Sequence, residues 1–339
     1  MFFRKEGNID MRGIYITLPK KENLIYGSAQ KEKIEKYAEI KGTFSGEDII
    51  TSEYKLLNDV DVIFSGWGMP KLTKELLDNA PNLKAVFYAA GSVKGLVAEE
   101  FWERNIVITS AYEANGIAVA EFTLAEIIYS LKMGWQFMGA YKSRLEILNK
   151  DIQKGGYMST VGIISLGAIG KKVCSLLKNF DVDIIVCDPY VSQETAEEMG
   201  VSLCTLEELF ERADVASLHT PLLPETVHMI TKKHFMAMKK NSAFINTSRG
   251  AVVNETEMIE ALQLRPDLYA VLDVTAQEPL NPESPILHLE NVVLTPHIAG
   301  AVGEDGRRMG QYMADEFERF VGGEPLKYSI TKEKMRIMA

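Results

Sequence analysis

Short apolar runs alternate with helix-like patterns along almost all of the 339 residues. The runs are rich in Val and Ile, which is typical of strands that are buried on both faces of a parallel sheet. The chain is long enough for two domains of ordinary size. We therefore expect an α/β protein that consists of two doubly wound parallel-sheet domains.

The expected strands form two groups. The first comprises residues 13–18, 61–67, 83–89 and 106–110, with helices near 29–39, 71–79 and 97–104, and the second comprises 160–165, 183–188, 215–219, 243–247, 270–274 and 292–295. Between the groups, residues 117–131 form a helix pattern with more apolar faces than one core needs. This helix either crosses the domain junction, packs on a second subunit, or is a plain buried helix.

Charge and cysteine content exclude several classes of protein. Lys and Arg number 37 against 47 Asp and Glu, and the net charge of −10 has the wrong sign for binding nucleic acid. The three cysteines show no CxxC spacing, so we expect neither a disulfide framework nor a metal site. A reducing cytoplasm is the expected compartment.

No segment has the pattern of a signal peptide or a membrane span. The N-terminus carries charges where a signal peptide needs an apolar run, and the stretch 117–131 contains Glu121 and Glu126. Residues before Arg12 lack periodicity, and we expect them to form a loose tail. We expect no membrane partner.

Two helix starts and one C-terminal stripe have specific signals. Thr205 with Glu208, and Asn254 with Glu257, each pair a cap residue with an acid three positions on, which predicts a reciprocal capping box. Beyond residue 300, apolar side chains recur at helical spacing, and we expect this helix to pack on the first domain: Met309, Tyr312, Met313, Phe317 and Phe320.

The stretch TVGIISLGAIG, followed by DVDIIVCDPY, is a dinucleotide-binding pattern in its required strand and helix context. Gly167 lets the backbone approach a pyrophosphate, and Gly170 lets helix and strand pack closely. Asp188 ends the next strand, where it can bond an adenosine ribose. Ser165 stands where the pattern has its first glycine, so its Cβ is expected to strain the turn.

Asp188 also predicts which dinucleotide binds. A carboxylate at the ribose repels a 2′-phosphate, and Pro189 and Tyr190 supply no cation to attract one. We therefore expect NAD as the cofactor in preference to NADP.

Three of the five histidines have a structural interpretation. We expect His228, His234 and His288 at the surface, because they lie in connections between strands. A fourth, His219, ends a strand at the ligand edge of the sheet, just before Thr220 and Pro221, which we expect beside the adenosine.

The fifth histidine, His297, follows the strand VVLTP, and two charged residues follow neighbouring strands. Arg249 lies in NTSRGAVV and Glu278 in LDVTAQEPL. An arginine can grip a carboxylate, a histidine can act as general acid or base, and a glutamate beside it favours its protonated form. Three such residues at one edge of a dinucleotide-binding sheet predict a catalytic site.

The order SLGAIG, CDPY, SLHTPLLPET, NTSRGAVVNE, LDVTAQEPL and LTPHIAG resembles the D-isomer-specific 2-hydroxyacid dehydrogenases. The resemblance covers nearly the whole chain and is strongest from 161 to 300. It implies that Arg249 binds the substrate carboxylate and carbonyl, that His297 passes the proton, and that Glu278 supports His297.

The same resemblance implies a substrate loop, a domain plan and an assembly. The segment AAGSVKG supplies backbone amides to the carboxylate through Ser92, Val93 and Lys94. A Rossmann NAD-binding domain, 112–299, is inserted in a flavodoxin-like substrate domain, 1–111 and 300–339, with no regulatory domain after it. The segment NGIAVAEFTLAEIIYSL matches a helix that builds dimers, so we expect a homodimer.

We predict an NAD-dependent oxidoreductase that interconverts a small (R)-2-hydroxy acid and its 2-oxo acid. The predicted cofactor-binding residues are Gly167, Ala168, Ile169, Asp188, Thr220, Thr247, Ser248, Arg249, Asp273, His297 and Gly300. Two alternatives stay open: a non-catalytic NAD-sensing interaction protein of the same fold, and a formate dehydrogenase.

Overall fold

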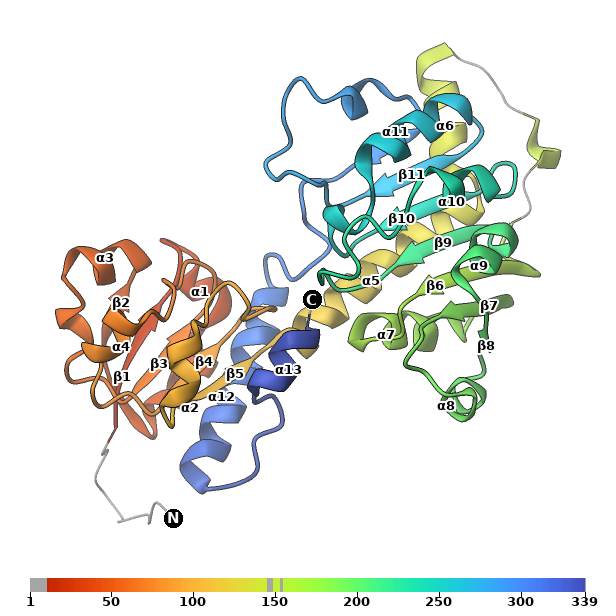
Figure 1. The fold of residues 1–339 in the computed structure, drawn as a ribbon. Coiled ribbons are helices and arrows are strands. Elements are labelled where there is room, and N and C mark those ends of the chain that lie inside the picture. The colour runs from red at the N-terminus through yellow and green to blue at the C-terminus, as the bar shows by residue number, and fades with distance from the viewer. Residues whose placement is uncertain (1–10, 145–148, 153–154, 339) are drawn as a thin grey trace. The chain divides into compact units, whose positions relative to one another are not determined.

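The computed structural model describes residues 11–144, 149–152 and 155–338, so the expected N-terminal tail lies outside the described residues. The chain divides into two compact units (Figure 1). Unit 1 comprises Met1–Gly116 and Ala301–Met338, and unit 2 comprises Ile117–Gly300. The sequence prediction placed these boundaries after residues 111 and 299.

Unit 1 is built on a parallel sheet of five strands in the order β2-β1-β3-β4-β5. Its strands are β1 (Met11–Ile16), β2 (Ala38–Phe44), β3 (Val62–Ser65), β4 (Ala85–Tyr88) and β5 (Val107–Ser110). All pairs are parallel, and this order is that of flavodoxin-like folds. The four strands expected in this region are present, so the predicted fold class is confirmed for this unit.

Strand β2 was missed by the sequence analysis, which ran a helix over 29–39. The helix ends at Glu35 and the chain enters the sheet at Ala38. Strand β2 lies at the edge of the sheet, and its exposed polar residues, such as Glu39 and Lys41, alternate with half-buried ones. It therefore lacks the apolar run by which the other strands were found.

Helices cover both faces of this sheet. They are α1 (Glu22–Ile25), α2 (Ser28–Glu35), α3 (Gly46–Thr51), α4 (Lys74–Asp78), α12 (Asp305–Gly322) and α13 (Lys332–Ile337), with 3₁₀ turns at Lys55–Leu57 and Glu99–Glu103. Helix α12 returns to unit 1 as predicted. Its buried Phe317 ring lies 4.9 Å from that of Phe64 and 5.3 Å from that of Phe87.

Unit 2 is built on a parallel sheet of seven strands in the order β12-β11-β10-β9-β6-β7-β8. The strands are β6 (Ser159–Ile164), β7 (Val182–Cys187), β8 (Ser202–Leu203), β9 (Val215–Leu218), β10 (Ala243–Asn246), β11 (Tyr269–Leu272) and β12 (Val292–Leu294). Six were predicted, and β8 was missed because it has only two residues. The order is that of the Rossmann fold with a further strand at one edge.

Two apolar cores enclose this second sheet. Helices α9 (Leu206–Arg212), α10 (Lys232–Ala237) and α11 (Glu255–Leu264) contribute to one, and α5 (Tyr112–Leu131), α7 (Ala168–Leu177) and α8 (Gln193–Glu198) contribute to the other. Helix α6 (Gly134–Arg144) and 3₁₀ turns at Lys150–Ile152, Gly250–Val252 and Pro285–His288 complete the unit. The strands are therefore covered on both faces.

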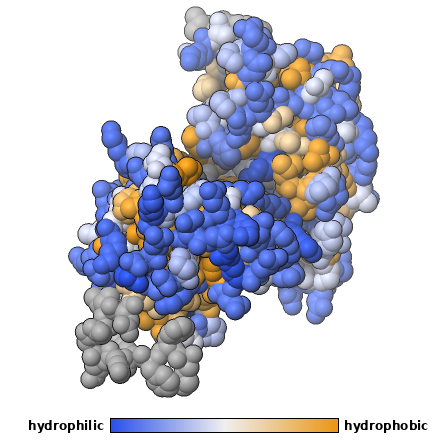
Figure 2. All heavy atoms as spheres, turned by 60° about the vertical axis from the view of Figure 1, so that its left-hand side comes forward, coloured by the Kyte–Doolittle hydropathy of each residue, from blue (hydrophilic) through white to orange (hydrophobic). Residues whose placement is uncertain are grey.

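Helix α5 is the one helix, within the part of the chain that is described, that is long and apolar enough to cross a membrane. Half of its most apolar stretch of 18 residues is buried inside the protein. A single helix of this kind is weak evidence for a membrane span, because core helices of other proteins have the same length and composition. Hydrophilic residues make up most of the surface visible in Figure 2, and apolar residues are exposed in smaller patches.

One of the two predicted capping boxes is complete. Thr205 accepts from the Glu208 amide at 3.1 Å, and Glu208 accepts from the Thr205 amide at 2.9 Å. At α11, the Asn254 side chain accepts from the Glu257 backbone amide as expected. The predicted bond from the Asn254 backbone amide to the Glu257 carboxylate is wrong. That backbone amide donates to the Ile230 carbonyl, and Glu257 accepts from the Asn254 side chain instead.

His234 is buried, which corrects the expectation that it lies at the surface. Only 3% of the residue is exposed, and its ring lies 5.1 Å from that of Phe210. Its Nδ1 accepts from the Thr231 amide at 3.0 Å, so the ring caps the start of α10. Burial lowers the pKa of this imidazole. The burial depends on a ring from α9, which no local pattern reveals.

Candidate functional site

The residues predicted for the cofactor and the chemistry in unit 2 all follow the carboxyl ends of its parallel strands, which meet at one edge of the sheet. Gly167 follows β6, Asp188 follows β7, and Thr220 follows β9. The remaining residues lie in the segments after β10, β11 and β12: Thr247, Ser248 and Arg249; Asp273 and Glu278; and His297 and Gly300.

The glycine turn has the shape that a dinucleotide pyrophosphate needs. Gly167 is the N-cap of α7, and a Cβ built there would meet no heavy atom of the described chain within 4 Å. A Cβ at Gly170 would lie 2.2 Å from the Ser165 carbonyl oxygen, so only glycine allows this close packing. No side chain among the described residues caps α7, which leaves the amides of its first turn, at Ala168 and Ile169, for an anion.

Asp188 is held at the end of β7 by backbone amides. Its Oδ2 accepts from the Leu166 amide at 2.7 Å and its Oδ1 from the Tyr190 amide at 2.8 Å. The carboxylate is thereby fixed beside the glycine turn. Each oxygen keeps a lone pair for a ribose hydroxyl. The turn and the acid together fit NAD.

Arg249 is half-buried and, within the described part of the chain, has no ion pair. Its Nη1 donates to the Ser248 carbonyl at 2.7 Å. Burial lowers the pKa of the guanidinium and the charge of Glu278 acts in the opposite direction. A desolvated cation without an ion partner is suited to an anionic ligand.

Close backbone packing brings the Arg249 loop to the loop that holds Glu278. A Cβ at Gly250 would lie 2.0 Å from the backbone carbonyl of Thr275, so this position requires glycine. The Thr275 amide in turn donates to Glu278 Oε1 at 3.3 Å. Arg249 and Glu278 are therefore held on adjacent segments.

Glu278 and His297 form a hydrogen-bonded pair. His297 Nδ1 lies 2.7 Å from Glu278 Oε2, and the two side chains are 52% and 39% exposed. The imidazole is thus anchored on one nitrogen and open to solvent. This arrangement leaves Nε2 for proton transfer to a bound ligand.

Asp273 holds the backbone that carries His297. Its Oδ1 accepts from Thr295 Oγ1 at 2.6 Å and from the Ile298 amide at 2.8 Å, and its Oδ2 accepts from the Ala299 amide at 2.8 Å. His297 itself has a φ of +53°, a left-handed conformation that needs such support. Thr295 was not named from the sequence, because its bond to Asp273 joins the ends of two different strands.

The predicted substrate loop lies in unit 1. Ser92, Val93 and Lys94 follow β4, and the Val93 side chain is fully buried. Ser92 Oγ accepts from the Lys94 amide at 3.4 Å. Within the chain as described, the amides of Ser92 and Val93 have no acceptor, so both are available to a ligand.

A Rossmann-type sheet, a glycine turn at a helix N-terminus and an acid after the next strand define an NAD-binding domain. Comparison with known proteins agrees: residues 138–299 match the model of "D-isomer specific 2-hydroxyacid dehydrogenase, NAD binding domain". The chain belongs to the D-isomer-specific 2-hydroxyacid dehydrogenase family.

Two relatives and one solved structure illustrate the match. D-3-phosphoglycerate dehydrogenase of Methanocaldococcus jannaschii is 33% identical over 79% of this chain and 51% of its own length. Glyoxylate reductase of Korarchaeum cryptofilum is 31% identical over 83% of this chain and 86% of its own. Rhodotorula graminis D-mandelate dehydrogenase shares the fold, with a TM-score of 0.79 and 22% sequence identity. The match covers 95% of this chain and 98% of that chain.

This chain spans about half the length of the first of these relatives, the phosphoglycerate dehydrogenase. The comparisons establish the family and the NAD-binding domain.

Proposed function

We propose that this protein is an NAD-dependent oxidoreductase that interconverts a small (R)-2-hydroxy acid and its 2-oxo acid. One arrangement carries the proposal: the 2.7 Å pair of His297 and Glu278, together with the half-buried Arg249, at the edge of an NAD-binding sheet. A positioned proton donor and an unpaired cation are what reduction of an anionic carbonyl compound needs.

In the reduction direction, Arg249 binds the substrate carboxylate and polarises the carbonyl oxygen. The chemistry that a reduced nicotinamide would supply, when bound, is hydride transfer to the carbonyl carbon. His297 donates the proton to the carbonyl oxygen from Nε2, and Glu278 stabilises the protonated ring through Nδ1. Oxidation of the hydroxy acid uses the same residues in reverse.

The substrate loop of unit 1 contributes neutral donors in this proposal. The amides of Ser92 and Val93, which have no acceptor within the described residues, bind carboxylate oxygens in this proposal, and the loop ends in Lys94. Such amides gain a hydrogen bond when a carboxylate binds, so they add affinity for acids.

The relatives narrow the panel of substrates to test. They are named for 3-phosphoglycerate and for glyoxylate, so the panel comprises glyoxylate, hydroxypyruvate, pyruvate and phosphohydroxypyruvate. The loss of NADH absorbance is followed with each. We expect turnover of at least one of these acids, with an (R)-hydroxy product. NADH binding without any turnover would support the non-catalytic alternative, and turnover of NAD with formate alone would support the formate dehydrogenase.

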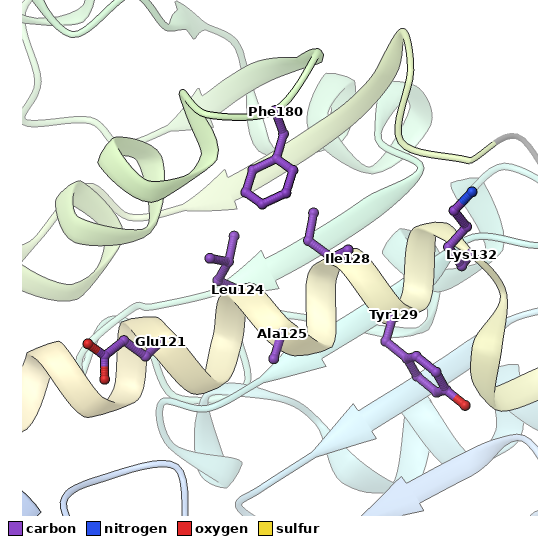
Figure 3. A pocket seen from close by; sticks show the side chains of 7 residues that line it. All are labelled: Glu121, Leu124, Ala125, Ile128, Tyr129, Lys132 and Phe180. Atoms are coloured by element: carbon purple, nitrogen blue, oxygen red, sulfur yellow. The ribbon is translucent and has the colours of Figure 1, made fainter.

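We also propose a homodimer built on the exposed side of α5. An apolar groove is lined by Leu124, Ala125, Ile128, Tyr129 and Phe180, with Glu121 and Lys132 at its ends. In Figure 3, Leu124 and Ile128 point from α5 towards Phe180. Two antiparallel copies related by a two-fold axis would pair the acid of one copy with the lysine of the other.

The cytoplasm is the compartment we propose. Cys174, Cys187 and Cys204 are free thiols, which suits a reducing environment. Burial raises the pKa of Cys174 to about 12 and that of Cys187 to about 11, so these thiols stay protonated at neutral pH.

A further inference from the structure

Ser165 occupies the tightest point of the glycine turn in a left-handed conformation, with a φ of +76°. Its amide donates to the Cys187 carbonyl at 2.9 Å. Its own carbonyl is pressed against Gly170, where a Cβ would lie 2.2 Å away. The backbone of Ser165 is therefore fixed on both sides. This conformation is one that glycine adopts freely and serine rarely does.

The Ser165 side chain makes a contact that glycine could not make. Its Oγ lies 2.8 Å from Thr220 Oγ1. Thr220 is only 3% exposed and follows β9, the strand that pairs with β6. A hydrogen bond thus joins the glycine turn to the neighbouring loop, at a place where water has little access to replace it.

The hydrogen-bonded chain continues to the proposed carboxylate-binding arginine. Ser248 Oγ donates to the Thr220 carbonyl at 2.5 Å, and the Ser248 carbonyl accepts from Arg249 Nη1 at 2.7 Å. Ser248 follows β10, the strand beside β9. Three successive loops at the carboxyl edge are thereby tied together, from the turn at Ser165 to the guanidinium.

We propose that Ser165 is a positioning residue whose hydroxyl, bonded to Thr220, holds the glycine turn in its NAD-binding shape. A turn that is ordered before binding loses less conformational freedom when the pyrophosphate arrives, so NAD binds more tightly. The strained backbone at Ser165 is retained because the hydroxyl gives the turn this rigidity. The inference rests on NAD binding by unit 2, and the proposed substrate plays no part in it.

The test is a double-mutant cycle on the dissociation constant of NADH, measured by fluorescence titration of the full chain without substrate. Ser165→Ala and Thr220→Val each remove one hydroxyl of the pair. Loss of one neutral hydrogen bond predicts a Kd about fivefold higher in each variant. The double variant is expected to bind no more weakly than the weaker single variant, because both substitutions remove the same bond.

Two further variants separate positioning from strain. Thr220→Ser keeps the hydroxyl and is expected to bind NADH more tightly than Thr220→Val. Ser165→Gly relieves the left-handed strain but loses the bond, so it is expected to keep or raise the melting temperature while raising Kd about fivefold. A purely structural role would lower the melting temperature and leave Kd unchanged.

Several outcomes would overturn the proposal. Additive losses of affinity would mean that Thr220 and Ser165 act separately, for example through a direct contact of Thr220 with the dinucleotide. A wild-type Kd in Thr220→Val, which leaves the Ser165 backbone untouched, would show that the bond positions nothing. NADH binding by Ser165→Gly at wild-type strength or tighter would show the same.

Discussion

His297 Nδ1 and Glu278 Oε2 lie 2.7 Å apart, and their side chains come from segments that follow two adjacent strands, β12 and β11. Asp273 fixes the backbone of the histidine segment through two amides, and the Thr275 amide fixes the glutamate. Because these backbone contacts hold both partners and Glu278 binds Nδ1 of the imidazole, Nε2 is left for a ligand.

Replacing Glu278 with Gln should lower the kcat of reduction. The variant keeps the side-chain shape but removes the charged partner of His297 Nδ1. A hydrogen bond to a charged group is worth about 1.5–3 kcal/mol, so kcat should fall roughly tenfold or more. Glu283→Gln, which changes an exposed glutamate in the same connection, is the matched control. Equal kcat for the wild type and Glu278→Gln would exclude the proposed support of His297.

NAD should be preferred to NADP by at least about tenfold in kcat/KM, because one unfavourable charge contact at a ligand is readily worth roughly 1.4 kcal/mol. Asp188→Asn retains an oxygen for the Leu166 amide but loses the charge, so the preference should shrink. The measurement is the ratio of kcat/KM for the two cofactors in both proteins. Equal efficiency in the wild type would remove Asp188 from this role.

The protein should be a dimer at micromolar concentration, and a charge placed in the groove of α5 should dissociate it. Ala125 is exposed and lines that groove, so Ala125→Arg should give monomers with an unchanged fold. Gln193→Arg adds the same charge at an exposed position of α8 and should remain dimeric. Light scattering measures the molecular mass of the wild type and of both variants in solution. A monomeric wild type would contradict the proposed assembly.

Burial of His219 should make the folded protein less stable in acid. Only 6% of His219 is exposed, and burial lowers its pKa to about 4. An unfolded chain binds a proton at this ring below a pKa of about 6.5, which the folded ring resists until about pH 4. The contribution of the neutral, buried His219 to the free energy of unfolding is thus fully present above pH 6.5. It is lost as pH falls towards 4, and the loss is at most about 3 kcal/mol.

The melting temperature of His219→Gln, measured between pH 6.5 and 4, tests whether His219 causes this loss of stability. The variant should show a smaller loss of melting temperature between pH 6.5 and 4 than the wild type. His288→Gln, which changes an exposed histidine, should follow the wild-type curve. Parallel curves for all three proteins would show that His219 does not carry the acid sensitivity.

The sequence predicted ten of the twelve strands because buried parallel strands are continuous apolar runs. It also predicted the edge of the sheet at which the site residues gather, since strand ends are visible in the pattern. It did not predict β2, whose alternate residues are exposed, or the burial of His234 under Phe210. Those features depend on edge position and on contacts between distant segments.

Within the candidate site, the sequence predicted single residues but not the hydrogen bonds between them. Ser165 and Thr220 were each named, but their hydrogen bond requires the pairing of β6 with β9. Thr295 was missed because its partner, Asp273, belongs to another strand end. Hydrogen bonds between loops are set by strand order, which local patterns leave undetermined.

If His297 donates the proton, replacing it with Asn should abolish most of the chemistry and leave cofactor binding intact. The variant is measured for NADH affinity by fluorescence and for kcat with the best 2-oxo acid of the panel, beside His288→Asn as control. We expect His297→Asn to bind NADH with wild-type affinity while its kcat falls roughly 10²- to 10⁴-fold, the usual contribution of a positioned proton donor. A near-normal kcat in His297→Asn would show that His297 does not donate the proton.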